Sequence, residues 1–255
     1  MVFCKTYNVE NFDIDVIANS GQVFRWERDK HIKSSYHVNT EAFDATITQV
    51  TPDVVTMSGT GNQYEAERYF TLNDDYKADY KQALRDMPLG VMELSHGMRI
   101  INQPFFEAAV TFVISQNNNI PRIEKIVNAI ADANNGIFPS RIKFRAMIQD
   151  RDFGTGYRWE YLKELADNCP SEAYLTSIGY EAALKELMGI NGIGIKVANC
   201  ICLYGLGYKN AAPVDVWVSR ALDEMGFDMW EDDYAGLKQQ LTFYWMRNRG
   251  VGYER

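Results

Sequence analysis

The sequence has few cysteines and no pattern of cysteines that is typical of a metal site. Its 255 residues include four, at positions 4, 169, 200 and 202, and the closest pair is spaced CxC rather than CxxC. Structural zinc sites and iron–sulfur clusters generally use regularly spaced sets of ligands. The sequence therefore predicts no metal site, and unpaired thiols are typical of an intracellular protein.

Long apolar segments are also absent. No run approaches the roughly 18 apolar residues of a membrane-spanning helix. Residues 1–6 lack the basic segment followed by an apolar core that marks a secretory signal. We therefore expect neither membrane insertion nor secretion.

Positive charge is in short supply. The chain has 26 Lys and Arg against 34 Asp and Glu, which gives a net charge of -8 and a pI near 5.0. A protein that coats nucleic acid is expected to show the opposite excess, because attraction to phosphates dominates non-specific binding. Acidic clusters such as Asp74-Asp75 could nevertheless face away from a local positive surface. The charge lowers the expected affinity for nucleic acid without excluding binding.

Hydrophobic patterning divides the chain into a sheet and a set of helices. From about residue 20 to 60, alternating β-branched and aromatic segments predict antiparallel strands, and beyond about 64 the periodicity is helical. We predict an α+β fold. A twisted antiparallel β-sheet domain with flanking helices covers residues 1–95, and an all-α region of two helical bundles covers 96–255, with a helix-hairpin-helix motif at 186–199. Helices are predicted at 105–114, from 121, and at 158–167, 180–188, 196–206, 216–225 and 234–247.

Ile190-Asn191-Gly192-Ile193-Gly194 joins two of these helices. Gly192 and Gly194 permit a tight turn and let backbone N–H groups approach a phosphate at a helix N-terminus. This predicts a grip on DNA that is blind to sequence. A glycine-rich connection without a ligand is the alternative.

Lys196 and Asp215 are the candidate catalytic residues. Lys196 falls in the first turn of a predicted helix, where the helix dipole disfavours the charged amine and so favours the neutral form that attacks carbon. Asp215 follows Pro213 and directly precedes another predicted helix. The alternatives are a solvated or phosphate-binding lysine and an ordinary N-cap aspartate.

Five separated motifs, in order along nearly the whole chain, carry a family resemblance. Residues 189–202 followed by Pro213-Val214-Asp215-Val216 resemble the helix-hairpin-helix and Gly/Pro–Asp signature of DNA glycosylases, specifically the 8-oxoguanine branch with a lysine nucleophile. The other four are GQVFRW at 21–26, NNNIPR at 117–122, GTGYR at 154–158, and YAG at 234–236 with Gln239 and Phe243 downstream.

The resemblance implies a bifunctional glycosylase and AP lyase of base excision repair. Lys196 would attack the sugar C1′ of a flipped nucleotide, expel the base and leave a Schiff base that proceeds to β-elimination. Asp215 would stabilise positive charge that develops on the sugar. No cofactor is required.

The resemblance also implies how 8-oxoguanine is recognised. The Gly21 carbonyl would accept the hydrogen on N7, which undamaged guanine lacks. Gln239 would read the Watson–Crick edge of the base, and Phe243 and Cys200 would cover its two faces. The alternatives are a turn glycine at position 21 and core or surface packing for the other three.

The opposite base is implied to be cytosine. Asn117, Arg122 and Arg158 match the positions that hydrogen-bond the cytosine left behind, and Tyr157 the one that fills the gap beside it. Asn117 could instead only end a helix, and the two arginines could be solvated charges. The expected partner is double-stranded DNA with 8-oxoguanine paired with cytosine, bound by a monomer in a prokaryotic cytoplasm (nucleoid) or a nucleus.

The sequence departs from the family at one motif position, and two other readings stay open. Trp217 occupies a place where the family commonly has histidine, so an imidazole–phosphate contact is lost, and residues 142–151 match poorly. One alternative is a non-catalytic helix-hairpin-helix DNA-binding protein, which would need neither Lys196 nor Asp215. The other is a glycosylase of the same superfamily for another damaged purine, a class that typically lacks the lysine.

Overall fold

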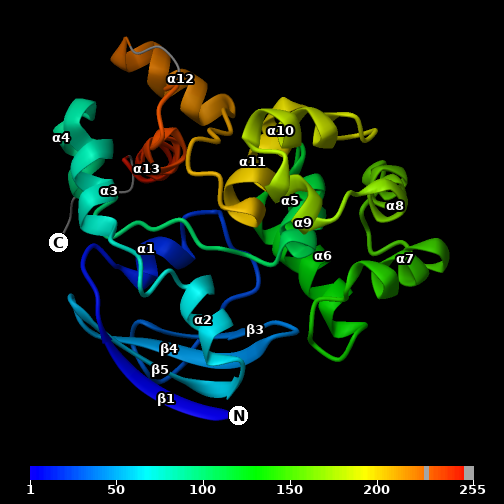
Figure 1. Cartoon of the computed structure of the whole chain (residues 1–255), viewed down its shortest axis with the longest axis horizontal. Coiled ribbons are helices and arrows are strands. Elements are labelled where there is room, and N and C mark those ends of the chain that lie inside the picture. Colours follow the sequence, from blue (N-terminus) through cyan, green and yellow to red (C-terminus); the bar gives the residue numbers. More distant parts are fainter. Residues whose placement is uncertain (227–229, 250–255) are drawn as a thin grey trace.

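A computed structural model of the chain describes residues 1–226 and 230–249 (Figure 1). Its strands are β1 Val2–Asn8, β2 Glu27–Arg28, β3 Ser35–Asn39, β4 Phe43–Thr51 and β5 Val54–Gly61. Its helices are α1 Ile14–Ala18, α2 Gln63–Tyr69, α3 Tyr76–Ala83, the 3₁₀ helix η1 Leu84–Asp86, α4 Leu89–Leu94, α5 Phe105–Ser115, α6 Ile120–Asp132, α7 Arg141–Asp150, α8 Arg158–Asn168, α9 Glu172–Ser177, α10 Tyr180–Met188, α11 Ile195–Leu206, α12 Val216–Met225 and α13 Ala235–Asn248.

The strands form one antiparallel sheet in the order β1-β5-β4-β3-β2. Alternate residues of β4, such as Ala45 and Ile47, are buried together with side chains of α1 and α2, so these helices cover one face. The sheet confirms the predicted fold class. β1 lies outside the predicted strands because Phe3 and Tyr7 are its only buried residues, too few to give an alternating pattern.

The helices form two groups, as Figure 1 shows. One contains α5 to α11, with α11 packed on α5 at its centre, and the other contains α3, α4, α12 and α13. The second group thus combines helices from both halves of the chain. Helix α13 packs on α3 and α4, which fall within residues 1–95. The predicted domain division at residue 95 stays a prediction. Residues 250–255 of the predicted helical region lie outside the described residues.

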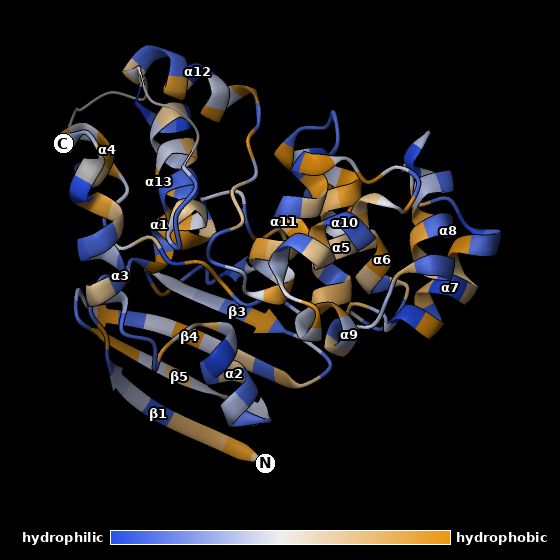
Figure 2. Cartoon of the chain, turned by 45° about the horizontal axis from the view of Figure 1, so that its top comes forward, coloured by the Kyte–Doolittle hydropathy of each residue, from blue (hydrophilic) through white to orange (hydrophobic). Residues whose placement is uncertain are grey.

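The apolar residues concentrate on α5 and α11, which Figure 2 colours mainly as hydrophobic. All but three of the residues of α5, and residues 197–205 of α11, are buried. The bounds of the predicted helices agree with the structure to within about two residues. α7 occupies the span that matched the family poorly. None of the described helices is both long and apolar enough to cross a membrane.

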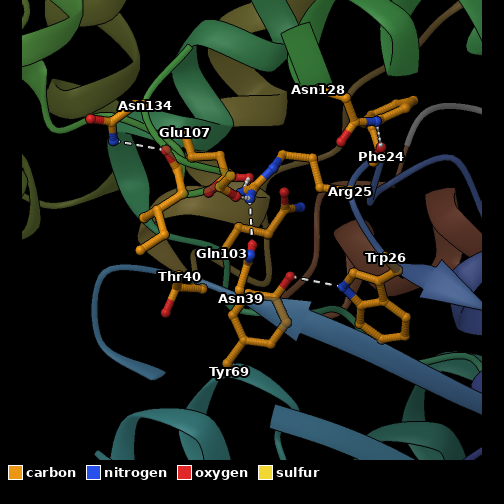
Figure 3. Close-up of polar contacts among 12 residues, drawn as sticks. Phe24, Arg25, Trp26, Asn39, Thr40, Tyr69, Gln103, Glu107, Asn128 and Asn134 are labelled. Atoms are coloured by element: carbon orange, nitrogen blue, oxygen red, sulfur yellow. Dashed lines mark hydrogen bonds and ion pairs between the residues drawn. The ribbon is translucent and has the colours of Figure 1, made fainter. Parts of the chain in front are cut away.

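Arg25 connects the sheet to the helices, as drawn in Figure 3. Its guanidinium donates to Glu107 on α5 at 2.8 Å, to Asn39 on β3 at 2.5 Å and to the Gly136 carbonyl at 2.9 Å. Next to it, the Trp26 indole donates to the Tyr69 hydroxyl at 2.9 Å. Burial raises the pKa of Glu107, and the charge of Arg25 opposes that rise. The second half of the GQVFRW motif is therefore built into the junction between sheet and helices.

Replacing Arg25 with Met should lower the free energy of unfolding by about 3–5 kcal/mol, because it leaves the Glu107 carboxyl buried without its partner. Urea denaturation measures this loss. The double variant Arg25→Met/Glu107→Leu should recover most of it. Lys77→Met, which breaks an exposed ion pair with Glu10, is the control and should cost less than about 1 kcal/mol. Equal losses in Arg25→Met and in Lys77→Met would contradict the role given to Arg25.

Candidate active site

The two helix groups meet at a pocket with a volume of about 50 Å³. It is lined by Gly21, Phe112, Lys196, Cys200, Tyr204, Pro213, Asp215, Gln239, Gln240 and Phe243. All six residues predicted to act on the base or the sugar are in this set. They come from α11, the start of α12, α13 and the segment after α1, so only the tertiary fold brings them together.

Lys196 and Cys200 are one turn apart on α11, and this spacing places both side chains on the same side of the helix. Lys196 is half-buried, with its Nζ 6.0 Å from the centroid of the Phe112 ring. Burial raises the pKa of the Cys200 thiol, which keeps it neutral. The neighbouring Lys196 opposes that shift, while the charge of Asp215 adds to it. The Lys196 amine and the Asp215 carboxylate therefore both lie close enough to the Cys200 thiol to act on it electrostatically.

Asp215 is both a helix cap and a pocket residue. Its Oδ1 accepts hydrogen bonds from the N–H groups of Trp217 and Val218, each at 2.9 Å, at the start of α12. Such a cap stabilises a helix by about 1 kcal/mol. None of the described residues donates to Oδ2. The cap thus fixes the orientation of the carboxylate and leaves its second oxygen for the pocket.

Gly21 has a left-handed backbone, with φ +79°. A Cβ at this position would lie 3.1 Å from Cε1 of Phe243 and 3.2 Å from Nη1 of Arg247. Within the described part of the chain, no group donates a hydrogen bond to its carbonyl. Gly21 is therefore a turn glycine, the alternative considered from the sequence, and also lies in the pocket next to Phe243.

Two of the polar groups that α13 carries, in Gln239 and Arg247, have no partners among the described residues. The Oε1 atom of Gln239 is buried and accepts no hydrogen bond, and Nη1 of Arg247 is buried and donates none. The Arg247 guanidinium lies 5.3 Å from the centroid of the Phe243 ring. Burial lowers the pKa of Arg247, and the negative charge of Asp215 opposes that shift.

Sequence reasoning missed Arg247 and three residues of the pocket wall, namely Phe112, Tyr204 and Gln240. Helical spacing could have found two of them. Arg247 is four residues after Phe243, and Tyr204 is four residues after Cys200. Gln240 gives no such signal, because its role depends on contacts with α11 and with the segment around Gly21.

The residues predicted to contact the opposite base form a second cluster, at the turn after α5. Asn117 is exposed, with φ +45°. Arg158 is buried and donates to the carbonyls of Gln116, Asn117 and Thr155, so it is not the solvated charge considered as an alternative. Two further members of the cluster are exposed. Arg122 donates to the Gly154 carbonyl at 3.1 Å, and Tyr157 stands edge-on to Tyr161.

α10 and α11 form the predicted helix-hairpin-helix. Gly192 in the turn has φ +90°, and a Cβ there would lie 2.2 Å from the Tyr161 ring. Gly194 immediately precedes α11 and has open space where a Cβ would be. Gln116 donates to the Gly192 carbonyl at 3.0 Å. The hairpin is therefore tied to the turn that carries Asn117.

Trp217, the departure from the family pattern, is 41% exposed, and the Arg220 guanidinium lies 5.7 Å from its ring. It is not buried in the core. Within the described residues, no group of three or more His, Cys, Asp or Glu side chains is placed to hold a metal ion.

A larger cavity, about 330 Å³, lies between the sheet and α5. None of the predicted site residues lines it. Several of its charged groups pair with other protein groups: Arg68 with Glu65, Glu107 with Arg25, and Arg141 with carbonyls near the end of α8. The chemistry predicted from the sequence therefore belongs to the smaller pocket.

The chain is similar to known DNA glycosylases. Residues 6–109 match the family model described as 8-oxoguanine DNA glycosylase, N-terminal domain. The N-glycosylase/DNA lyase of Saccharomyces cerevisiae is 28% identical across an alignment of 247 residues, which covers 80% of this chain and 65% of the yeast protein. The chain thus spans somewhat less than two thirds of the length of the yeast protein. Its matches cover 28% of a probable N-glycosylase/DNA lyase of Methanothermobacter thermautotrophicus and 39% of the N-glycosylase/DNA lyase OGG1 of Arabidopsis thaliana.

Two solved structures are similar over nearly the whole chain. The 8-oxoguanine glycosylase/lyase of Clostridium acetobutylicum, solved with double-stranded DNA containing cytosine opposite 8-oxoG, has a TM-score of 0.83 and 27% identity, with 98% of each chain covered. MBOgg1, solved with a low-affinity DNA ligand, has a TM-score of 0.85 and 24% identity, and the match covers 98% of this chain and 99% of that one. At 24% identity, the similarity to MBOgg1 is one of fold.

Replacing Gly192 with Ala should destabilise the protein by more than about 2 kcal/mol, because it combines a left-handed backbone with a clash against the Tyr161 ring. Gly194→Ala, two residues along the same turn, should cost no more than about 1 kcal/mol, because the added methyl group meets open space and only the N-cap preference for glycine over alanine is lost. Urea unfolding of both variants measures the difference. Similar losses in the two would show that the hairpin geometry described here is wrong.

Proposed function

We propose, because this chain belongs to the family of 8-oxoguanine DNA glycosylases, that it removes 8-oxoguanine from DNA and then cleaves the strand as an AP lyase. The observation that carries the proposal is the pocket itself. A half-buried lysine, a carboxylate with a free oxygen, and two groups suited to binding a purine converge there from distant parts of the chain. A protein that only bound DNA would not need this pocket.

The reaction begins at Lys196. Its neutral amine attacks C1′ of the flipped nucleotide, the bond between C1′ and the base breaks, and the departing base takes up the proton that the amine loses. The bond between C1′ and the ring oxygen O4′ then breaks, O4′ takes up the remaining proton of the amine, and a Schiff base results. β-Elimination from this Schiff base removes a proton from C2′ and breaks the bond between C3′ and its phosphate oxygen. Positive charge develops on the sugar as the base departs. The open oxygen of Asp215 stabilises this charge because the cap at α12 already holds the carboxylate in place.

Recognition of the base uses two acceptors, the Gly21 carbonyl and Gln239 Oε1, to which none of the described residues donates a hydrogen bond. The Gly21 carbonyl accepts the hydrogen on N7 of 8-oxoguanine, whereas undamaged guanine presents a lone pair there. Gln239 reads the Watson–Crick edge, where guanine carries N–H donors that its buried Oε1 can accept. Phe243 and Cys200 cover the two faces of the ring.

The second cluster contacts the rest of the duplex. Asn117, Arg122 and Arg158 hydrogen-bond the cytosine left behind, and Tyr157 fills the gap in the stack. Four of the five N–H donors of Arg158 already bind the carbonyls of Gln116, Asn117 and Thr155, which leaves one for the cytosine, so Arg158 also fixes the shape of this surface. Gly192 and Gly194 bring backbone N–H groups close to a phosphate. The protein acts as a monomer on double-stranded DNA inside the cell.

Borohydride reduction in the presence of an 8-oxoguanine:cytosine duplex should trap a covalent complex between protein and DNA. The complex should disappear in Lys196→Gln, because the amide cannot form a Schiff base. Denaturing gel electrophoresis measures the adduct. Failure of the unaltered protein to form any adduct would favour a DNA-binding protein without catalysis. An undiminished adduct in Lys196→Gln would place the nucleophile elsewhere.

Asp215→Asn should reduce base excision by at least about a hundredfold while DNA binding is retained. The amide keeps a capping oxygen for the N–H groups of α12 but loses the negative charge. Single-turnover excision and equilibrium binding separate the two effects. An equal loss of both would assign Asp215 a purely structural role.

Excision should depend on the base opposite the lesion. Cytosine should be preferred by about tenfold or more, and Arg122→Gln should reduce the preference, because each good hydrogen-bonded pair contributes about 1–3 kcal/mol of discrimination. Excision rates on four duplexes that differ only in the opposite base measure this. Arg145→Gln, a change of the same charge at an exposed ion pair with Asp167, is the control. Equal rates on all four duplexes would refute the cytosine contact.

A further inference from the structure

The chain on both sides of Gly21 is held by a buried polar network. Its members are Ser20, Gln22, Gln103, Tyr204 and Gln240, whose exposed fractions range from 0 to 6%. Buried polar side chains of this kind fix a single arrangement when every hydrogen bond is made, and each group left unpaired costs free energy. The network encloses the one residue of the pocket whose proposed function depends on its backbone.

One route runs through α13. The Tyr204 hydroxyl donates to Oε1 of Gln240, and Nε2 of Gln240 donates to the Ser20 carbonyl at 2.9 Å. This bond fixes the plane of the peptide group that precedes Gly21. Gln240 is next to Gln239 and three residues before Phe243. The same bond therefore sets the position of α13 relative to Gly21.

The other route starts from the same tyrosine. The Tyr204 carbonyl accepts from the Gln103 N–H at 2.8 Å, and the Gln103 side chain donates to the Gln22 carbonyl at 2.7 Å. The Gln22 side chain is itself fixed, since it donates to Ser20 Oγ and the Arg99 carbonyl and accepts from the Ile101 N–H. These bonds fix the chain that follows Gly21.

Tyr204 belongs to α11, the helix that carries Lys196 and Cys200, and its ring stacks on Phe112 with centroids 5.0 Å apart and an angle of 18°. Both routes therefore tie the Gly21 carbonyl to the helix of the proposed nucleophile. A hydrogen bond weakens steeply as its angle departs from linear, so an acceptor that selects one N–H must be held in direction as well as in place.

We infer that Gln240 and Tyr204 are positioning residues that hold the Gly21 carbonyl in the direction needed to accept the N7 hydrogen, and so set the discrimination between 8-oxoguanine and guanine. This inference rests on the proposed function. Both residues line the pocket, and both act through the bonds that hold the chain around Gly21. Their effect is confined to steps that require recognition of the base, so strand cleavage at a site that has already lost its base proceeds without them.

The test compares two activities of the same variants. In Gln240→Met and in Tyr204→Phe, excision of 8-oxoguanine opposite cytosine should fall by at least about tenfold, and the ratio of its rate to that on undamaged guanine should fall with it. Cleavage of a duplex with a preformed abasic site should change by less than about twofold. The double variant should be little worse than either single one, because both act on the same route. Tyr204→Phe only removes a hydroxyl and is the variant best able to retain the fold.

The matched control is Tyr180→Phe. Its hydroxyl also donates to a side-chain amide on α11, that of Asn199, at 2.7 Å, but has no bond to the network around Gly21. This variant should retain both activities. Unchanged excision in Gln240→Met and Tyr204→Phe would overturn the inference, and so would equal loss of excision and abasic-site cleavage. Absence of 8-oxoguanine excision by the unaltered protein would instead refute the proposed function.

Discussion

The packing of α11 against α5 is the constraint on which the rest of the structure depends. Small side chains such as Ala108 and Ala198 are completely buried in this group of helices, and the two helices approach closely. Because α11 is buried along most of its length, the place where its first turn emerges from the core is fixed. Lys196 and the hairpin are thereby fixed together, so the proposed grip on the DNA backbone and the proposed attack on the sugar share one rigid element.

The remaining parts of the site are brought to α11 by polar contacts as well as by apolar packing. Arg25 joins the segment after Gly21 to α5, the network of Tyr204 and Gln240 joins Gly21 to α11 and α13, and Gln116 joins the hairpin to the turn with Asn117. Polar contacts are directional, and apolar packing alone tolerates sliding. A site that distinguishes two purines by one hydrogen bond needs this directional control. The negative net charge is compatible with the proposed selectivity, because that selectivity rests on groups that line the pocket.

Some residues have two roles, and the sequence alone presented these roles as competitors. Asp215 caps α12 and lines the pocket, and Gly21 forms a tight turn and contacts Phe243. In each case the structural role fixes the group that is available for chemistry. Arg158, in contrast, could not be understood from its position in a motif, because its donors bind backbone carbonyls that only the folded turn places within reach.

The sequence by itself determined the local features: the helices from their 3.6-residue periodicity, the central strands from alternation, and the motif residues from their order along the chain. Such features depend on neighbours within a few positions. It gave no sign of β1, whose partner β5 lies about fifty residues away, or of the packing of α13 on α3 and α4. The parts played by Gln240 and Arg247 were equally hidden. These depend on contacts between distant segments, and the tertiary structure decides them because the burial and the partner of a polar side chain are set by what the fold places around it.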